Sequence, residues 1–468
     1  MIKNKHVNES VVYIATDRLY AGRLRAYGGY NYMPNIEKLV KYGTKYNNAT
    51  ATAGSTIMTH SSEWTGKYTA DLHGNEDFKD RVYLNFLPKQ KTIFHDFIEK
   101  GFNTYIVLVE NKAKGPTTTN GKITAFAPGY DSFRPAYNLW PKELNIVKLP
   151  GMDIKGGEKL RRKDQIMKAA ELIQESEKEG KPAFVFIKCH GYNKTEYRSE
   201  YLRYANQQRV TDDDLYNAEI DEALGHLMSH YNYPNKDCPT IWFASDHGSW
   251  AGEAFRNHYG YHLHQEIVHV PLVSSRGGGK VVDSVFSMKE VRRLLTNNSP
   301  NMSEYYIFAE TLYPGQITDK PNNGISSTAS IMVRLNRYKY IYSMFGPEGD
   351  SEATEELYDL AYDPREKFNL AAAFTHIHKD VAGPSEGGVP FHHVSSRLNS
   401  NVSKSIEALN SSEAYCCYLC QIRKTGMKTS FTLSGWDEIF KIYMKLRSRA
   451  KRYWKETGRG NNFIVKDI

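Results

Sequence analysis

Three short apolar runs, each followed closely by a carboxylate or an imidazole, constrain the fold of this chain more than any other sequence feature. The runs and their polar followers are Val11–Ala15 with Asp17, Phe184–Ile187 with His190, and Ile241–Ala244 with Asp246 and His247. Helix-like stretches lie between the runs, at Asn35–Tyr42 and at Asp214–His230. Apolar runs that alternate with helical patterns predict a mostly parallel sheet with helices on both faces.

The polar followers are candidates for one site, because an open α/β sheet places its active site beyond the carboxyl ends of its strands. Carboxylates and imidazoles ligate divalent metals and transfer protons. A single Asp or His in such a place is more often a helix cap or a structural residue, whereas the adjacent pair Asp246-His247 is about as often functional as structural. The coincidence of all three predicts a functional site at this edge of the sheet.

The composition supports a large folded core and excludes a wholly disordered or fibrous protein, because 40% of the 468 residues are hydrophobic and 24% are charged. Nothing approaches the run of about 18 apolar residues that a membrane helix needs, so no membrane span is expected. The first residues lack the apolar core of a secretory signal. Five cysteines, few and odd in number, suit a reducing compartment, so we expect a cytoplasmic protein.

The net charge of +8 belongs to the C-terminal tail, since residues 421–468 hold 12 Lys and Arg against 4 Asp and Glu. The rest of the chain is neutral, so no nucleic-acid partner is expected. A solvated helix face is the more common reason for such a tail. The alternative is a contact with a polyanionic substrate, a membrane surface or another subunit. A homo-oligomer is compatible with the last of these.

The sequence character changes near residue 325, where a pattern typical of a β-hairpin begins, with a turn at Asn336-Arg337. A final amphipathic helix follows, with Ser434 as its expected N-cap and Asp437 and Glu438 in its first turn. The predicted domains are a catalytic domain at 1–325 and a C-terminal subdomain at 326–468, made of antiparallel strands at 328–371, an irregular insertion at 372–434 and a basic amphipathic helix at 435–456.

Residues 51–68 form a segment rich in hydroxyl groups that becomes helix-like toward Gly66. A hydroxyl in the first turn of a helix lies where backbone N–H groups and the helix dipole favour an anion. A metal ion beside such a hydroxyl lowers its pKa and makes it a nucleophile. Taken alone, the segment is more typical of an N-cap Ser or Thr, so the choice of a nucleophile depends on the neighbouring motifs.

Several segments over residues 10–371 follow a family pattern in chain order: VVYIATDRLYAGRLRAYG, MPNIEKLVKYGTKYNNATA, Thr56–Gly66, PAFVFIKCHGYNKTEY, ASDHG, GEAFRNHYGYHLHQEIVHVPLV, RLNRYKYIYS and ELYDLAYDPREKFNLA. They resemble the sulfatase family, within the alkaline phosphatase superfamily. The resemblance implies an α/β/α sandwich with a large mixed, mostly parallel sheet. It also implies a smaller C-terminal subdomain with a short antiparallel sheet and a terminal helix.

The resemblance further implies a site for one divalent metal ion, which could be Mn, Mg, Ca or Zn. The metal ligands would be Asp17, Thr56, Asp246 and His247. The catalytic residues would be Thr56 as nucleophile, His190 and His258 as groups that contact an anionic ester and protonate its leaving group, and His60 as a group that orients the nucleophile or binds an ester oxygen. His262 is an alternative to His258, because the spacing in HYGYHLH fits either residue.

The nucleophile segment departs from the family pattern, in which a Cys or Ser in Cys/Ser-x-Pro-x-Arg becomes formylglycine. Thr56 stands in that place, with Met58 for Pro and His60 for Arg, and Thr cannot form the aldehyde. Moving the frame to Ser55 does not restore the motif. A Thr nucleophile is the pattern of relatives that act on phosphorus, where a metal-bound alkoxide can attack in line and form a phosphothreonine.

The predicted function is therefore a metal-dependent hydrolase of a phosphodiester, a phosphonate or a phosphate ester. A sulfate-ester hydrolase that works without formylglycine and a phosphoryl-group transferase are the alternatives. A catalytically inactive binding protein of the same fold is a weaker alternative, supported by the altered nucleophile segment and by Thr16-Asp17 in place of the family's Asp pair. Metal content separates it from the enzymes, because such a protein need not hold a metal.

Overall fold

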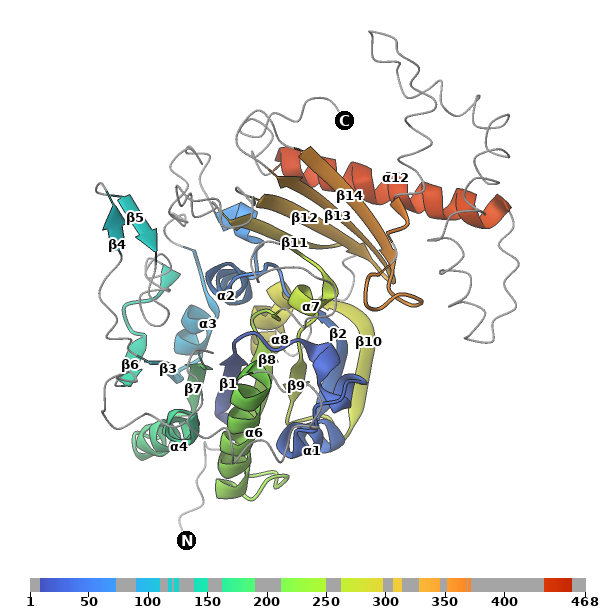
Figure 1. Cartoon of the computed structure of the whole chain (residues 1–468). Coiled ribbons are helices and arrows are strands. Elements are labelled where there is room, and N and C mark those ends of the chain that lie inside the picture. The colour runs from blue at the N-terminus through green and yellow to red at the C-terminus, as the bar shows by residue number, and fades with distance from the viewer. Residues whose placement is uncertain are drawn as a thin grey trace. The chain divides into compact units, whose positions relative to one another are not determined.

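The computed structural model describes residues 9–72, 90–109, 117–119, 122–125, 139–149, 162–189, 212–249, 262–297, 306–313, 328–345, 352–367, 369–371 and 433–456. The chain divides into two compact units, whose elements are labelled in Figure 1. The first unit comprises Met1–Glu304 and Ala309–Ser327, and the second comprises Tyr305–Phe308 and Thr328–Ile468.

The first unit is built on an eight-stranded sheet with the order β10-β2-β9-β8-β1-β7-β3-β6. Its strands are β1 (Val11–Thr16), β2 (Thr44–Thr50), β3 (Asn103–Val109), β6 (Asn145–Leu149), β7 (Ala183–Lys188), β8 (Thr240–Ser245), β9 (Leu272–Ser274) and β10 (Lys280–Ser287). Neighbouring strands are parallel except at β9, which is antiparallel to β2 and to β8. A separate antiparallel ribbon joins β4 (Thr117–Thr119) and β5 (Lys122–Ala125). The predicted mixed, mostly parallel sheet is confirmed.

Helices cover both faces of this sheet (Figure 1). One layer holds α1 (Pro34–Tyr42), α4 (Arg162–Lys178) and α6 (Asp212–His230), and the other holds α2 (Thr56–Thr65), α3 (Ile93–Glu99) and α8 (Val291–Asn297). Shorter helical turns are α7 (Gln265–Val268) and the 3₁₀ helices at Ala21–Arg23, Arg25–Tyr27, Thr69–Leu72 and Met288–Glu290. The predicted α/β/α sandwich is therefore confirmed.

The central strands are apolar throughout because their side chains alternate between two buried layers. Val12 and Ile14 of β1 belong to the core that includes residues of α1, α4 and α6. Tyr13, between them, points to the opposite face and stacks on Phe186, with ring centroids 5.3 Å apart. Phe186 lies in turn 5.7 Å from the ring of Trp64 on α2. Because both faces of the central strands are buried, the polar residues of these segments cluster at the strand ends.

The second unit contains an antiparallel four-stranded sheet with the order β11-β12-β13-β14 and the long helix α12 (Leu433–Glu456). The strands are β11 (Ile307–Tyr313), whose residues are divided between the two units, β12 (Thr328–Leu335), β13 (Tyr338–Phe345) and β14 (Glu352–Asp359). The predicted turn at Asn336-Arg337 joins β12 to β13, and Asn336 adopts a left-handed φ of 52°, which Asn tolerates better than most residues. The predicted short antiparallel sheet and terminal helix are confirmed.

The start of α12 differs from the prediction. The helix begins at Leu433, so Ser434 lies inside the first turn and is not the N-cap, and that turn holds no acidic residue. Asp437 and Glu438 therefore lie beyond it. A local capping pattern does not specify how far a helix extends on its N-terminal side. The predicted insertion at 372–434 lies, up to residue 432, outside the described residues.

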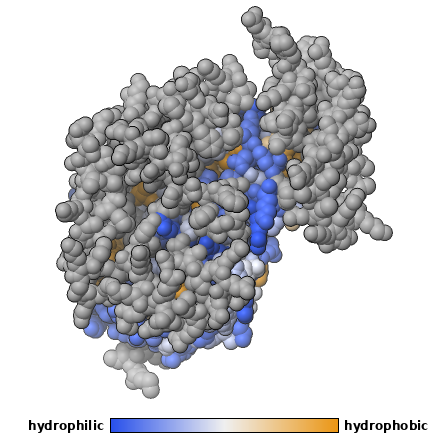
Figure 2. Space-filling view, in the orientation of Figure 1, coloured by the Kyte–Doolittle hydropathy of each residue, from blue (hydrophilic) through white to orange (hydrophobic). Residues whose placement is uncertain are grey.

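The described surface in Figure 2 carries both hydrophilic and apolar side chains. On the face that Figure 2 shows, the described side chains are mainly hydrophilic, with apolar colour only in small patches. Large apolar side chains exposed by 39–45% are Tyr30, Tyr32, Tyr42, Ile146 and Val281. Within the described ranges, no helix is both long enough and apolar enough to cross a membrane.

Candidate functional site

The centre of the eight-stranded sheet brings Asp17, Asp246 and His247 together. Strand β1 lies between β7 and β8 and is parallel to both, so the carboxyl ends of the three strands lie side by side. The register pairs Thr16 with Ser245, the residues directly before Asp17 and Asp246. One ligand atom from each of the three side chains lies within 4.8 Å of the other two. The sheet thus brings together the polar residues that follow β1 and β8.

This donor set fits a divalent metal ion. Protein ligands lie about 2.0–2.6 Å from such an ion, so two ligands of one ion are at most about 5 Å apart. His247 Nδ1 is 2.8 Å from the Gly248 carbonyl oxygen, which can only accept, so Nδ1 donates and Nε2 is the ring nitrogen left to face an ion. That Nε2 lies 3.4 Å from Asp17 Oδ1 and 3.7 Å from Asp246 Oδ2. Two buried carboxylates this close together are costly without a cation.

Thr56 is the first residue of α2 and lies beside the donor set. Its Oγ1 is 3.3 Å from His247 Nε2. The preceding residue, Ser55, has an extended backbone, and its side chain makes no capping hydrogen bond. The N-terminal end of α2, where the helix dipole is positive, is therefore placed at the donor set. A half-buried hydroxyl in this position can serve as a metal ligand or as a nucleophile.

Two backbone features shape the loops that carry these side chains. Gly248 follows His247, and a Cβ at Gly248 would lie only 2.0 Å from the carbonyl oxygen of Glu266, so the close approach requires glycine. Arg18 follows Asp17 and has a φ of 62°, a left-handed conformation that costs a non-glycine residue about 1 kcal/mol or more. Both features lie next to a proposed ligand, where the direction of a side chain matters most.

Lys188, the last residue of β7, belongs to the same centre and was missed by sequence reasoning. Its side chain is 0% exposed, and its Nζ lies 2.6 Å from Asp246 Oδ2. The Nζ also donates to the Thr16 carbonyl oxygen at 3.3 Å. The available signal was a lysine at the end of an otherwise apolar strand, because lysines are almost never fully buried without a partner.

His60 lies near Asp246 as well, in a buried network with Glu63 and Tyr13. His60 Nε2 is 3.9 Å from Asp246 Oδ2, and its Nδ1 is 2.6 Å from Glu63 Oε2. The Tyr13 hydroxyl donates to Glu63 Oε1 at 3.4 Å. Burial, and then the charge of Asp246, raise the pKa of Glu63 well above its usual range. Glu63 therefore favours its neutral form, and the negative charge of this region is concentrated on Asp17 and Asp246.

The predicted proton donors are only partly within the described chain. His190 and His258 lie outside the described residues. His262, the alternative to His258, is described: its Nε2 is 3.8 Å from Glu266 Oε1, and its Nδ1 is 3.1 Å from His264 Nδ1. The assignment of a leaving-group acid stays a prediction.

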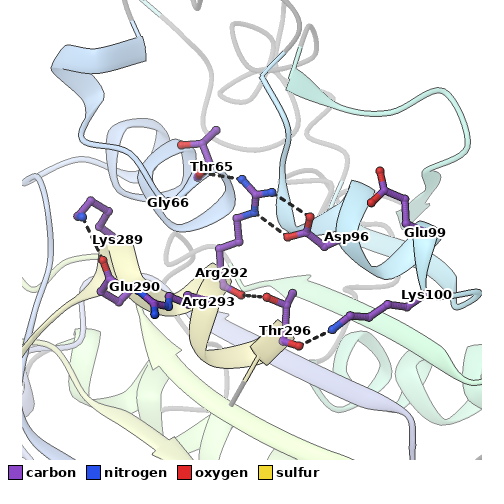
Figure 3. A pocket seen from close by; sticks show the side chains of 10 residues that line it. All are labelled: Thr65, Gly66, Asp96, Glu99, Lys100, Lys289, Glu290, Arg292, Arg293 and Thr296. Carbon is purple, nitrogen blue, oxygen red and sulfur yellow. Dashed lines mark hydrogen bonds and ion pairs between the residues drawn. The ribbon is translucent and has the colours of Figure 1, made fainter. Parts of the chain in front are cut away.

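A polar cavity of about 570 Å³ lies at the opposite end of α2, where Thr65 and Gly66 line it (Figure 3). Arg292 lies at its centre and is held by Asp96, with Arg292 Nε 2.7 Å from Asp96 Oδ2, and by the Thr65 carbonyl oxygen at 2.9 Å. The ten residues of α2 separate this cavity from Thr56 by roughly 14 Å of helix. The cavity is therefore distinct from the donor set, and its central arginine links α2, α3 and α8.

Comparison with known proteins agrees with this arrangement. A family model described as Sulfatase matches residues 9–312, which is more than half of the 468 residues. No curated protein matches the sequence.

Solved structures with a similar fold come from more than one kind of hydrolase. The phosphonate monoester hydrolase of Agrobacterium radiobacter has a TM-score of 0.54 at 15% identity, over 85% of this chain and 96% of that one. A phosphonate monoester hydrolase from Silicibacter pomeroyi has 0.50 at 13%, over 86% and 96%. A Bacteroides thetaiotaomicron protein of glycosaminoglycan metabolism, labelled a 4S-sulf, has 0.57 at 12%, over 80% and 94%. At such identities the likeness concerns the fold alone.

Proposed function

We propose, from the premise that the chain belongs to the sulfatase family, that it is a metal-dependent hydrolase of a phosphorus ester: a phosphodiester, a phosphonate or a phosphate ester. The observation that carries the proposal is the position of Thr56 Oγ1, 3.3 Å from His247 Nε2 at the start of α2. A hydroxyl beside such a donor set can bind the metal and attack the ester.

A divalent ion at this centre would offset the repulsion between the Asp17 and Asp246 carboxylates and an anionic ester. Asp17, Asp246, His247 and Thr56 would hold one divalent ion. The chemistry that the ion supplies when bound is neutralisation of these carboxylates, a lower pKa for the hydroxyl and stabilisation of charge on the ester oxygens. The donor set of two carboxylates, an imidazole and a hydroxyl is compatible with Mn, Mg, Ca or Zn.

Thr56 would carry the reaction through two displacements. Its hydroxyl gives up a proton to solvent, Oγ1 attacks phosphorus in line, the bond between phosphorus and the leaving oxygen breaks, and a phosphothreonine forms. The leaving oxygen takes up a proton, for which His190, with His258 or His262, is the predicted donor. Water then attacks phosphorus and loses a proton, the bond from phosphorus to Thr56 Oγ1 breaks, and Oγ1 takes up a proton, which regenerates the hydroxyl.

The side chain of Thr56 favours phosphorus over sulfur. A formylglycine hydrate carries a second hydroxyl, so its sulfate ester can break down by elimination. A Thr sulfate ester lacks that route and would have to be displaced by water. A phosphothreonine is open to in-line attack by water, assisted by charge neutralisation at the phosphoryl oxygens.

The test compares 4-nitrophenyl esters: a phosphate monoester, a phosphodiester, a phosphonate monoester and a sulfate. Each is assayed with Mn, Mg, Ca and Zn in turn, for the wild type and for Thr56→Ala. We expect turnover of at least one phosphorus ester in wild type and a loss of roughly 10³-fold or more in Thr56→Ala. Full activity in Thr56→Ala would contradict the assignment of the nucleophile.

Two variants serve as controls for this experiment. Thr56→Ser keeps a hydroxyl at the same position and should retain measurable activity. Ser55→Ala removes the neighbouring hydroxyl, which makes no capping hydrogen bond, and should change kcat/KM only slightly. Turnover of the sulfate ester alone would instead favour the sulfatase alternative. Transfer of the phosphoryl group to an added alcohol, in preference to water, would favour a transferase.

A further inference from the structure

Lys188 is a buried cation that the proposed reaction does not use. Its Nζ donates to Asp246 Oδ2 at 2.6 Å and to the Thr16 carbonyl oxygen at 3.3 Å, and the side chain is 0% exposed. Its main chain is held too, because the Lys188 carbonyl accepts a hydrogen bond from Gln165 Nε2 at 2.7 Å. Removing either charge would leave the other buried without its partner, so Lys188 and Asp246 form one electrostatic unit.

The two oxygens of Asp246 have different surroundings. Oδ1 accepts a hydrogen bond from the backbone N–H of His247 at 2.9 Å. Oδ2 is the oxygen that pairs with Lys188, and it also lies 3.7 Å from His247 Nε2. The ammonium and a divalent ion held by Asp17, Asp246 and His247 would therefore share one buried carboxylate. Like charges that close repel each other strongly, because the effective dielectric constant of a protein interior is low.

We propose that Lys188 is a positioning residue that stands in for the metal: its ammonium holds Asp246 in place in the metal-free protein and weakens the binding of a divalent ion. This inference rests on the proposed function, since it assumes a metal at this centre. A group that stabilises the metal-free state more than the metal-bound state lowers the metal affinity. The loss in binding free energy equals the difference between the two stabilisation free energies. Lys188 thus keeps the centre preformed and makes its metal exchangeable.

The test measures Mn²⁺ binding by competition with a chelator at one pH. The variants are Lys188→Met, which removes the charge at nearly constant length, Lys188→Gln, which keeps a hydrogen-bond donor, and Lys188→Arg, which keeps the charge. We expect Lys188→Met and Lys188→Gln to bind Mn²⁺ roughly tenfold or more tightly than wild type, and Lys188→Arg to stay within about threefold. A Lys188→Met protein that folds only with Mn²⁺ present would also support the inference.

A matched control comes from the second unit, where Lys339 forms a similarly buried pair. Lys339 Nζ is 2.7 Å from Glu366 Oε1, and the side chains are 0% and 1% exposed. Lys339→Met makes the same chemical change in a pair that includes no proposed metal ligand. It should lower thermal stability and leave the Mn²⁺ affinity as in wild type, so a tighter affinity in Lys188→Met cannot come from destabilisation in general.

The outcomes separate this inference from the proposed function. If wild type binds one Mn²⁺ and the two uncharged variants bind it equally or more weakly, Lys188 does not oppose the metal, and the inference is overturned while the metal centre stands. If wild type binds none of Mn²⁺, Mg²⁺, Ca²⁺ and Zn²⁺, the metal centre and the inference both fall. The Thr56→Ala assay tests the nucleophile independently of either result.

Discussion

Both units bury ionised side chains, but they balance them differently. In the second unit, Lys339 pairs with Glu366, and Glu355 accepts hydrogen bonds from Arg447 Nε at 2.9 Å and from the Tyr443 hydroxyl at 2.5 Å. Glu366 and Glu355 are each matched by a cation. The first pair joins β13 to the segment that follows β14, and the second joins β14 to α12.

In the first unit, a buried ion pair shares its carboxylate with a cluster of possible metal ligands. Asp17 and Asp246 lie in a single donor cluster with His247, and Lys188 pairs with Asp246. The convergence of donor atoms distinguishes this centre from the pairs in the second unit. A buried ion pair alone therefore does not indicate a functional site, whereas a convergent group of possible metal ligands does.

Asp246→Ala should have the largest effect of the predicted changes, because it disrupts the donor cluster of the first unit. It removes a proposed metal ligand and leaves the Lys188 ammonium buried without its carboxylate. We expect esterase activity to fall roughly 10³-fold or more and the free energy of unfolding to fall by about 3–5 kcal/mol. Activity is measured with the 4-nitrophenyl esters, metal content by elemental analysis and stability by urea unfolding.

The double variant Asp246→Ala with Lys188→Met sharpens the same comparison. Removing both charges should recover a large part of the stability and none of the metal binding. Metal content that stays at the wild-type level in Asp246→Ala would exclude Asp246 as a ligand.

Glu355→Ala is the corresponding change in the second unit and should have a smaller, purely structural effect. It leaves Arg447 and the hydroxyls of Tyr340 and Tyr443 without their shared acceptor. We expect a loss of about 2–4 kcal/mol in stability, with metal content and kcat/KM unchanged. A drop in metal content comparable to that of Asp246→Ala would contradict the separation of the two kinds of buried charge.

The smallest expected effect concerns Asp221, a carboxylate that accepts hydrogen bonds from the backbone N–H groups of Asn35 and Ile36 at the start of α1. Burial raises the pKa of Asp221 from 3.8 to about 6, although these hydrogen bonds oppose the shift. The folded state thus binds the proton more tightly than the unfolded chain. The stabilisation due to protonation is complete below about pH 4 and is lost as the pH rises through about 6.

Asp221→Asn cannot titrate and should remove this pH dependence. The stability of wild type relative to Asp221→Asn should fall by about 2 kcal/mol between pH 4 and pH 7, as measured by urea unfolding at several pH values. A relative stability that rises over this range would mean that the hydrogen bonds outweigh the burial of the carboxylate.

The sequence correctly predicted those elements that follow from local residue patterns and from their order along the chain. Apolar runs of four or five residues predicted β1, β7 and β8 because strands buried on both faces must be apolar at every position. The hydroxyl-rich segment predicted a helix that ends near Gly66, and its first residue is Thr56. The cap at Ser434 was wrong, since a local capping pattern does not specify how far a helix extends on its N-terminal side.

By itself, then, the sequence determined the fold class, the family pattern and the residues that follow the central strands. Only the tertiary structure decided that Lys188 reaches Asp246, that His60 lies near the same carboxylate and that Thr56 Oγ1 comes within 3.3 Å of His247 Nε2. These contacts join residues far apart in the chain, and they depend on the order and register of β7, β1 and β8. Strand order results from the packing of the whole sheet, so the local pattern of each strand does not specify it.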